Sequence, residues 1–432
     1  SLTSNGETDA FILKLNEQGN FLWASQFGGA GNGDAIGGIA VDPSNNIYIS
    51  GSFSDNVDFD PSPANDFTLT AQGLQDRFVL KLDDGLQFVW AKQLGGTEAV
   101  GGGKIAIDAT NAIVVQGSFF GTVDFDTSAT NEIRTTNGSS DMYIQKLNSE
   151  GNHIWVATFG GIENDEISTL QLDAANHIYA TGTFRETVDF NPSGGGDIRD
   201  AAGSRDIFVQ KYDSDGSVIW TQTIGGTGFD DARCLSLHDN GTLFIAGKFN
   251  DTVDFDPGPN TANATTNTPD IYLLQLDTNG AFVGYKTITG SSFDNAFGSA
   301  ISAANELYIT GNFMETIDFD ASGPMPAITA TGMSDIFVLK FGNPSLGISS
   351  TSLVLEGITA FPNPTNGGFS LGVPNALGSV DVTITNLVGQ RILSRQFQQN
   401  KNMTLTLPEA SGVYFCTVTS AGASATIKMI KN

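Results

Sequence analysis

The feature that most constrains this fold is a tandem repeat of about 65 residues. An apolar segment that begins with Asp recurs six times, and consecutive copies start 64 to 67 residues apart. Three other features share the period: an aromatic residue in a short apolar run, a Gly that ends another run, and a Phe in a Val/Ile-Asp-Phe-Asp/Asn motif. Four anchors with one period identify a tandem array. They are Asp9, Asp76, Asp141, Asp206, Asp270 and Asp335; Trp23, Trp90, Trp155, Trp220 and Tyr285; Gly51, Gly117, Gly182, Gly247 and Gly311; and Phe59, Phe125, Phe190, Phe255 and Phe319.

Each repeat predicts four short strands in two hairpins. Typical runs are "RFVLKL" (77–82), "FVWAKQL" (88–94), "KIAID" (104–108) and "AIVVQGSF" (112–119). They are β-branched or aromatic, alternate in hydrophobicity and are separated by Asp-Gly, Asn-Gly or Asn-Asn turns. Four strands per unit is the composition of a propeller blade. The unit exceeds the roughly 40–50 residues of a typical blade, and the excess lies between strands two and three, around 54–75 and its equivalents.

The number of blades depends on how the ring closes. Five hairpins of each kind occur, followed by one extra strand at 335–341. If the first hairpin (9–27) closes the ring against the fifth inner hairpin (298–313), five blades is the simplest count. Residues 1–8 resemble the tail of a preceding unit and Ser1 is not Met, so we expect upstream residues to have been removed or to be missing from this sequence. Six or seven blades would then be possible.

The array resembles the SBBP family of β-propeller repeats over about residues 9–341. The resemblance is carried by "GGIAVDPSNNIYISGSF" (37–53) and "DRFVLKLDDG" (76–85). It implies a propeller and, by itself, no particular activity.

A different domain follows a Gly- and Ser-rich segment at 342–357, which we expect to be a linker. The alternating strands of residues 358–432 predict a small Ig-like β-sandwich. Four segments in this region resemble, in order, the type A sorting domain of type IX secretion cargo. The residues that match its motif are Pro362, Asn363, Pro364, Gly389, Gly412, Tyr414 and Lys428.

This resemblance implies export across the outer membrane of a Gram-negative cell. The precursor would pass through the periplasm, a shuttle protein and the translocon would recognise residues 358–432, and a sortase would remove them. The propeller would then be cargo, located outside the cell or on the outer-membrane surface. The alternative is an ordinary C-terminal β-sandwich with no sorting role.

Charge narrows the possible partners of the propeller. The net charge is −27, and residues 346–432 hold five Lys/Arg and three Asp/Glu, so the first 345 residues carry −29. Such a surface repels nucleic acid and anionic lipid. No apolar run approaches the roughly 18 residues of a membrane span. Cys234 and Cys416 fall in different predicted domains, so we expect no disulfide between them.

Paired acidic residues suggest a tentative calcium site in each repeat. In a strand, Asp58 and Asp60 would share one face, and Asp55 lies close by in the sequence. Hard oxygen ligands favour Ca²⁺, although no copy has the full spacing of a known calcium loop. The alternative is that these side chains cap turns while the Phe between them fills the blade. The pairs are Asp58/Asp60, Asp124/Asp126, Asp189/Asn191, Asp254/Asp256 and Asp318/Asp320, with Asp251, Glu186 and Glu315 near the later ones.

Catalysis has little support in the sequence. His153, His177 and His238 occupy different repeat positions, and no carboxylate pair stands out from those repeated in every blade. The regular position of the Trp residues favours packing over sugar binding, and Gly-rich segments such as 225–232 favour blade-to-blade turns. We therefore expect a secreted binding or adhesion module for a surface glycan or protein. The alternative is a secreted glycan-active enzyme, and a purely structural cargo is a third possibility.

Overall fold

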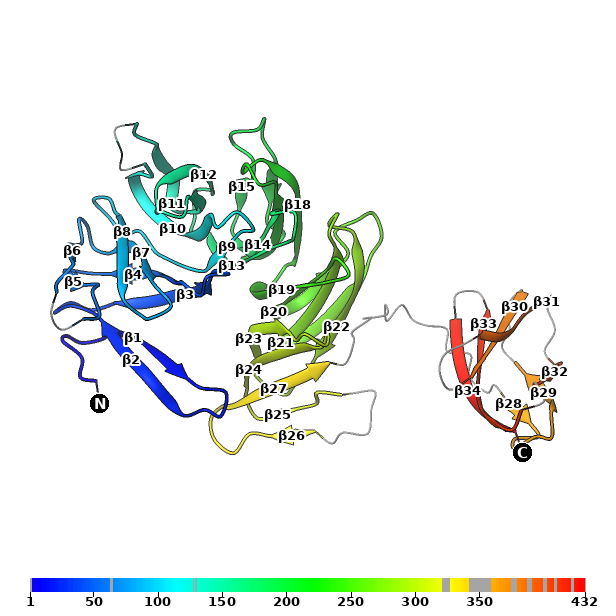
Figure 1. Cartoon of the computed structure of the whole chain (residues 1–432). Helices are drawn as coiled ribbons and strands as arrows, with labels where there is room; N and C mark the ends of the chain where they lie inside the picture. Colours follow the sequence, from blue (N-terminus) through cyan, green and yellow to red (C-terminus); the bar gives the residue numbers. More distant parts are fainter. Residues whose placement is uncertain are drawn as a thin grey trace. The chain divides into compact units, whose positions relative to one another are not determined.

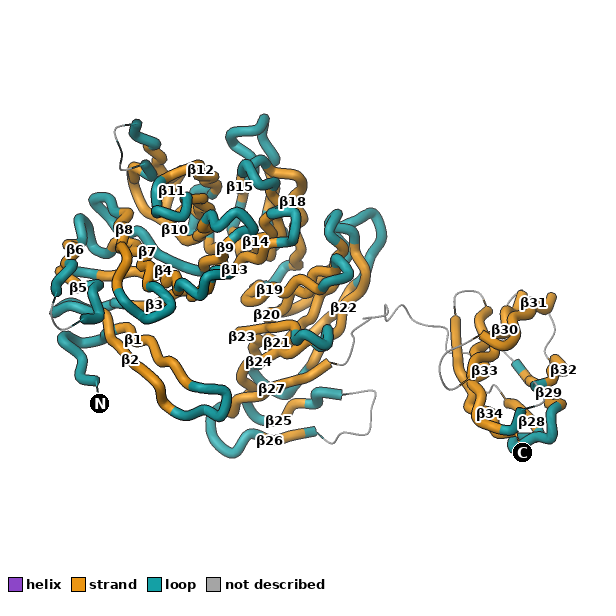
Figure 2. Tube along the Cα trace, viewed as in Figure 1, coloured by secondary structure: helices purple, strands orange, loops and turns teal. Residues whose placement is uncertain are grey.

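The computed structural model describes residues 2–62, 65–126, 128, 130–320, 327–341, 359–373, 379–386, 391–398, 402–407, 410–420 and 423–431. These residues form strands and loops without a helix, which confirms the all-β prediction (Figure 2). Within this part of the chain there is accordingly no helix that could span a membrane. The chain separates into two compact units, Ser1–Gly347 and Ile348–Asn432. The expected linker at 342–357 lies outside the described residues.

The first unit is an array of antiparallel sheets fanned around a common centre, as in a β-propeller (Figure 1). Four groups of four strands form blades, which we number 1 to 4 in chain order. Their strands, from the centre outward, are β3 (Ala35–Val41), β4 (Ile47–Phe53), β7 (Asp76–Leu82) and β8 (Phe88–Leu94); β9 (Ile105–Ile107), β10 (Ile113–Asp124), β11 (Ile133–Leu147) and β12 (His153–Phe159); β13 (Glu166–Leu172), β14 (Ile178–Phe184), β17 (Asp206–Tyr212) and β18 (Val218–Gly226); and β19 (Asp231–His238), β20 (Thr242–Asp254), β21 (Asn263–Asp277) and β22 (Phe282–Ile288). Blades 3 and 4 belong to one eight-stranded sheet, because Gly225 and Gly226 of blade 3 pair with Asp254 and Val253 of blade 4.

Two partial sheets flank these blades, and their pairing corrects the expected ring closure. β23 (Asn295–Ile301), β24 (Leu307–Phe313) and β27 (Asp335–Phe341) form a three-stranded sheet, whereas β1 (Ala10–Leu15) and β2 (Phe21–Phe27) pair only with each other. The first hairpin therefore does not pair with β24, because β27 takes that place along its whole length. β27 has the same sequence pattern as β1 and is far closer to β24 along the chain, so pairing costs less loop-closure entropy. The number of blades stays a prediction.

The excess residues of each repeat lie between the second and third strands, as predicted. In blades 1 and 3 they form separate small hairpins, β5 (Asn56–Asp58) with β6 (Thr68–Thr70) and β15 (Thr187–Asp189) with β16 (Ile198–Asp200). The three-stranded sheet has β25 (Thr316–Ile317) with β26 (Ile328–Thr329). In blades 2 and 4 the long central strands themselves continue into the insertion. Each insertion starts beside the Gly-rich turn of the preceding repeat, so all five lie at equivalent places around the array.

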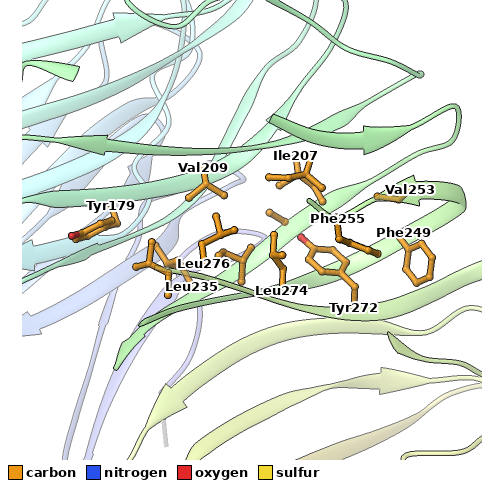
Figure 3. Packing of buried hydrophobic residues seen from close by; sticks show 14 residues of the cluster. Tyr179, Ile207, Val209, Leu235, Phe249, Val253, Phe255, Tyr272, Leu274 and Leu276 are labelled. Atoms are coloured by element: carbon orange, nitrogen blue, oxygen red, sulfur yellow. The ribbon is translucent and has the colours of Figure 1, made fainter. Parts of the chain in front are cut away.

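The Phe of each Val/Ile-Asp-Phe motif fills the interior of its own blade. Phe255 in blade 4 has its ring 5.4 Å from that of Phe249 and 5.2 Å from that of Tyr272 (Figure 3). Phe190 in blade 3 meets two aromatic rings in the same way. All five motif Phe residues are buried. The repeated motif therefore serves packing, because aromatic clusters with tilted and edge-on ring pairs bury large apolar areas.

The Trp residues pack between neighbouring blades. Trp90, Trp155 and Trp220 lie against Gly151, Gly216 and Gly280, each in the outer turn of the following blade. The indole N–H groups of Trp155 and Trp220 also donate to backbone carbonyls there, at 3.2 and 3.1 Å. Each of these glycines has a positive φ of 78° to 86° and leaves no room for a side chain beside the indole. These contacts support the packing interpretation.

The fifth aromatic anchor, Tyr285, is out of register with the Trp residues. Gly284 faces Gln275 in blade 4, at the position where Trp220 faces Lys211 in blade 3. A shift of one residue turns a side chain to the opposite face of the sheet. The Tyr285 ring therefore stacks on Phe255 within its own blade, with centroids 4.9 Å apart.

The second unit consists of two antiparallel sheets that enclose one core. One sheet contains β28 (Thr359–Phe361), β29 (Gly368–Gly372) and β32 (Asn402–Thr406) in that order. The other has the order β31 (Arg391–Gln398), β30 (Ser379–Asn386), β33 (Gly412–Ser420) and β34 (Ala423–Lys431). Both sheets contribute to the core through Phe369, Leu371, Val382, Ile384, Met403, Leu405, Cys416 and others. The Ig-like classification stays a prediction.

Candidate functional sites: the C-terminal motif, the Asp turns and a charged cluster

The Pro-Asn-Pro segment of the C-terminal motif is hydrogen-bonded to β34, the last described strand. Pro362, Asn363 and Pro364 are exposed and follow β28. The side-chain amide of Asn363 donates to the carbonyl of Lys428 at 2.7 Å and accepts the backbone N–H of Ile430 at 2.8 Å. These two bonds satisfy the backbone of β34 as a neighbouring strand would. Segments about 65 residues apart in the sequence therefore form one surface.

The other described motif residues, Gly412, Tyr414 and Lys428, lie on the paired strands β33 and β34. Gly412 faces Lys431 in the pairing of β33 with β34, and Tyr414 is buried, with its hydroxyl donating to the carbonyl of Ala410 at 2.9 Å. Lys428 is exposed. Gly389 lies outside the described residues. The structure thus brings Asn363 and Lys428 together, whereas Tyr414 contributes from the interior.

Two apolar side chains are exposed beside this motif. Phe361, two residues before Asn363, is 76% exposed, and Ile430, two residues after Lys428 on β34, is 38% exposed. We call Phe361, Asn363, Lys428 and Ile430 the terminal patch. Exposed apolar residues next to polar ones are typical of protein-binding surfaces.

The acidic pairs of the propeller form turns instead of one face of a strand. β5 ends at Asp58, and the Oδ1 atom of Asp58 accepts the N–H groups of Asp60 at 3.0 Å and Phe67 at 2.8 Å. The interpretation of a shared strand face is therefore wrong. A carboxylate that follows a strand end is free to bond the backbone two residues on, which is an Asx turn. The first Asp of each other pair does the same: Asp124, Asp189, Asp254 and Asp318 accept the N–H groups of Asp126, Asn191, Asp256 and Asp320 at 2.9 to 3.1 Å.

The acidic residues just before these pairs also have a backbone role. Asp55, Glu186, Asp251 and Glu315 have φ angles of 48° to 60°, and Gly121 has the same place in blade 2 with a φ of 66°. Each insertion therefore starts at a left-handed residue. Among the described residues, no group of three or more His, Cys, Asp or Glu side chains is arranged to hold a metal ion. Calcium binding by the acidic pairs stays a prediction.

Another set of Asp residues closes the Gly-rich turns between blades. Asp165 accepts the N–H of Gly161 at 2.7 Å and that of Arg185 at 3.0 Å, and Asp230 makes the equivalent bonds to Gly226 and Asn250. Both are almost completely buried. Burial, with a smaller contribution from neighbouring acids, raises the pKa of Asp165 to about 6 and that of Asp230 to about 7. These contacts support the expectation that the segments are blade-to-blade turns.

One charged cluster interrupts the similarity of the blades, at the junction of blades 3 and 4. The buried Asp231 carboxylate pairs with Arg205 at 3.1 Å and Arg233 at 2.9 Å, and Lys248 lies 3.6 Å away. Arg205 also pairs with Glu166 at 2.8 Å. Three cationic groups, from Arg185, Arg205 and Lys248, lie 5.1 to 5.8 Å from the centre of the Phe229 ring.

Sequence reasoning missed this cluster because it compared what the repeats share. The position of Lys248 carries an uncharged residue in each other repeat, namely Ser52, Ser118, Thr183 and Asn312. A charge at a repeat position that is otherwise neutral was the signal that could have revealed it.

Comparison with known families identifies both units. Residues 22–52 match the β-propeller repeat model, and residues 359–432 match the secretion system C-terminal sorting domain. The first unit is therefore a β-propeller of the SBBP repeat type. The second is a type IX sorting domain, which marks the chain as secretion cargo for the cell surface or the extracellular space.

Individual relatives are distant. An uncharacterized WD repeat-containing protein of Acanthamoeba polyphaga mimivirus is 23% identical over 62% of this chain, and the regulatory protein FlaEY of Caulobacter vibrioides is 23% identical over 41%. The matched regions span only 23% and 18% of those two proteins.

Two solved structures resemble this chain only weakly. A Bacteroides caccae protein of unknown function has a TM-score of 0.31 at 10% identity, covering 68% of this chain and 78% of its own. Dimeric latent PorU from Porphyromonas gingivalis has a TM-score of 0.15 at 9% identity, covering 92% of this chain and 32% of its own. Scores this low do not indicate a common fold.

Proposed function

We propose that the propeller acts outside the cell as a binding or adhesion module and that the sorting domain presents the terminal patch to the secretion machinery. The observation that carries the proposal is the combination of a sorting domain with blades whose repeated acidic residues are used in turns. Those carboxylates hold backbone N–H groups, which argues against their use as paired acid and base. The charged cluster at blades 3 and 4 offers a side-chain constellation specific to one junction, as a binder requires.

The shuttle protein, the translocon and the sortase are the proposed partners of the sorting domain. The terminal patch supports this role because it combines exposed apolar groups with the Lys428 cation, a composition suited to protein recognition.

Deletion of residues 358–432 tests the export function. We expect the truncated chain to remain inside the cell as a folded protein, because its propeller is a separate compact unit. Cell fractionation with a protease-resistance assay measures both properties. Normal amounts of truncated protein in the medium would contradict a sorting role.

A single substitution tests the terminal patch more sharply. We expect Lys428→Glu to reduce export strongly without unfolding the domain, because the side chain is exposed. Asp381→Asn, also exposed on the same unit, is the matched control and should be exported normally. Equal export of both variants would exclude Lys428 from recognition.

Incubation of the purified full chain with cell-surface polysaccharides separates binding from catalysis. A binding module should retain polysaccharide of unchanged length. Shortened products would favour the alternative of a glycan-active enzyme.

A further inference from the structure

A polar cavity of about 260 Å³ lies between blades 1 and 2. Arg77 and Lys92 reach it from β7 and β8 of blade 1, and Gln145 and His153 reach it from β11 and β12 of blade 2. Asp126, Asn152 and the hydroxyl residues Ser128 and Thr130 complete the polar lining. Side chains of two blades therefore meet around one small space.

Arg77 is a buried cation without an acidic partner among the described residues. It is only 2% exposed, and its Nη1 atom donates a hydrogen bond to Oε1 of Gln145, at 2.6 Å. The Nε atom is buried without a hydrogen-bond partner, and the guanidinium lies 5.7 Å from the centre of the Tyr143 ring. Guanidinium groups stay charged in proteins. A buried charge without a counter-charge is costly, so this site favours an anion supplied from outside.

A chain of hydrogen bonds extends the donor character of Arg77 to His153. Because Oε1 of Gln145 accepts from Arg77, the amide nitrogen of Gln145 is the donor toward the carbonyl of Phe125, at 2.7 Å, and toward Nδ1 of His153, at 3.0 Å. His153 then carries its proton on Nε2. Arg77, Lys92 and His153 are thus three donor groups at one cavity.

Two of the polar residues that line this cavity are exceptions in the repeat. The position of Arg77 holds an apolar residue in each other copy, namely Ala10, Met142, Ile207, Ile271 and Ile336. The position of His153 holds Phe21, Phe88, Val218 and Phe282. Packing of a blade therefore requires neither Arg nor His at these places. Because both residues line one cavity, we infer that they bind a ligand there.

We propose that this cavity binds the carboxylate of a single acidic sugar, such as a hexuronate. Its volume of about 260 Å³ is slightly below the roughly 300–1,000 Å³ of pockets for drug-sized ligands, which suits one monosaccharide unit. Arg77 matches a carboxylate in shape and charge, and the amide and hydroxyl side chains around it match sugar hydroxyls. Asp126 also lines the cavity and repels dianions, so a monoanionic carboxylate is favoured over phosphate. This inference rests on the proposal that the propeller is a binding module, and it names the ligand class.

Titration of the full chain with glucuronate, glucose, acetate and phosphate at pH 7 tests the inference. We expect glucuronate to bind in calorimetry and to raise the melting temperature, while glucose and phosphate bind at least 10-fold more weakly. If acetate bound as tightly as glucuronate, the cavity would still be a carboxylate site, but recognition of the sugar would be refuted. Absence of glucuronate binding at millimolar concentration would overturn the whole inference.

The variant Arg77→Met separates binding from folding. Met occupies this position in blade 2, so we expect the variant to melt at the same temperature as the parent or higher, yet to lose glucuronate binding at least 10-fold. His153→Phe should also fold and bind more weakly, since Phe is found there in three other repeats. Arg199→Met is the control. Arg199 pairs with Asp197 in blade 3 and does not line the cavity, so this variant should bind glucuronate normally.

Unchanged glucuronate binding by Arg77→Met would exclude this cavity as the site. If the chain retains cell-surface polysaccharide but does not bind glucuronate, the propeller is still a binding module. Only the proposed hexuronate site is then refuted.

Discussion

The buried Asp residues of the blade junctions make the stability of the propeller depend on pH. The pKa is raised by burial to about 6 for Asp141 and Asp165 and to about 7 for Asp230 and Asp294. Such groups bind protons more tightly in the folded chain than in the unfolded chain, where Asp titrates near 4. The free energy of unfolding therefore falls as the pH rises from about 4 to 7.

We expect a higher melting temperature at pH 5 than at pH 8 in calorimetry at matched ionic strength. Asp230→Asn should flatten part of this slope because it removes one titrating group. Asp215→Asn, at an exposed turn, should leave the slope unchanged. A melting temperature that rises from pH 5 to pH 8 would show that these carboxyls are not the dominant titrating groups.

Individual residues also show where prediction from sequence stops. The motif Phe residues fill the blades, as the alternative to the calcium interpretation predicted, and all five are buried. Arg77 and His153 were missed because their importance lies in a departure from the repeat, and because the partner of Arg77 comes from the next blade. No spacing within one repeat indicates that contact.

Among the elements, the start of each insertion carries a conformational cost that can be measured. Glu186 has a φ of 48° and an exposed side chain, in the place where blade 2 has Gly121. The left-handed region costs a residue with a side chain roughly 1–2 kcal/mol, partly offset by the greater chain entropy of Gly. We expect Glu186→Gly to raise the free energy of unfolding by about 0.5 kcal/mol in urea denaturation.

The reverse substitution is the control. Gly121→Ala should lower the free energy of unfolding by about 1 kcal/mol or more, because its added methyl group takes a strained φ and meets Oε1 of Glu98 at 3.1 Å. Stabilisation by Gly121→Ala would contradict this account of the insertion.

The sequence predicts which segments form strands, but it predicts less well which strands pair with each other. β1 and β27 share one pattern, so sequence alone does not decide which of them pairs with β24, and only the structure shows that β27 does. Tyr285 was placed in register with the Trp residues because any aromatic in an apolar run satisfies the pattern. Side-chain direction, which a one-residue shift reverses, is invisible at that level.

For the molecule as a whole, calcium binding is the remaining question raised by the charge of −27. A cation bound only by the folded chain would raise its melting temperature. One oxygen of the first Asp in each pair already holds backbone N–H groups. Calcium binding by the pairs predicts a higher melting temperature in millimolar Ca²⁺ than in EDTA at matched ionic strength, whereas turn capping alone predicts equal melting temperatures. A clear rise with Ca²⁺, reversed by Asp58→Asn, would establish the calcium hypothesis.

The hydrogen bonds between Asn363 and β34 determine when the sorting domain can be recognised during synthesis of the chain. The start of the motif is held by the backbone of Lys428 and Ile430, and Thr365 donates to the Ile430 carbonyl at 2.8 Å. A nascent chain therefore does not complete the terminal patch until β34 has left the ribosome. A chain that stops before β34, through premature termination or proteolysis, has every residue of the propeller but no assembled patch. If the secretion machinery recognises the terminal patch, as proposed above, this step would admit only polypeptides whose synthesis has passed β34.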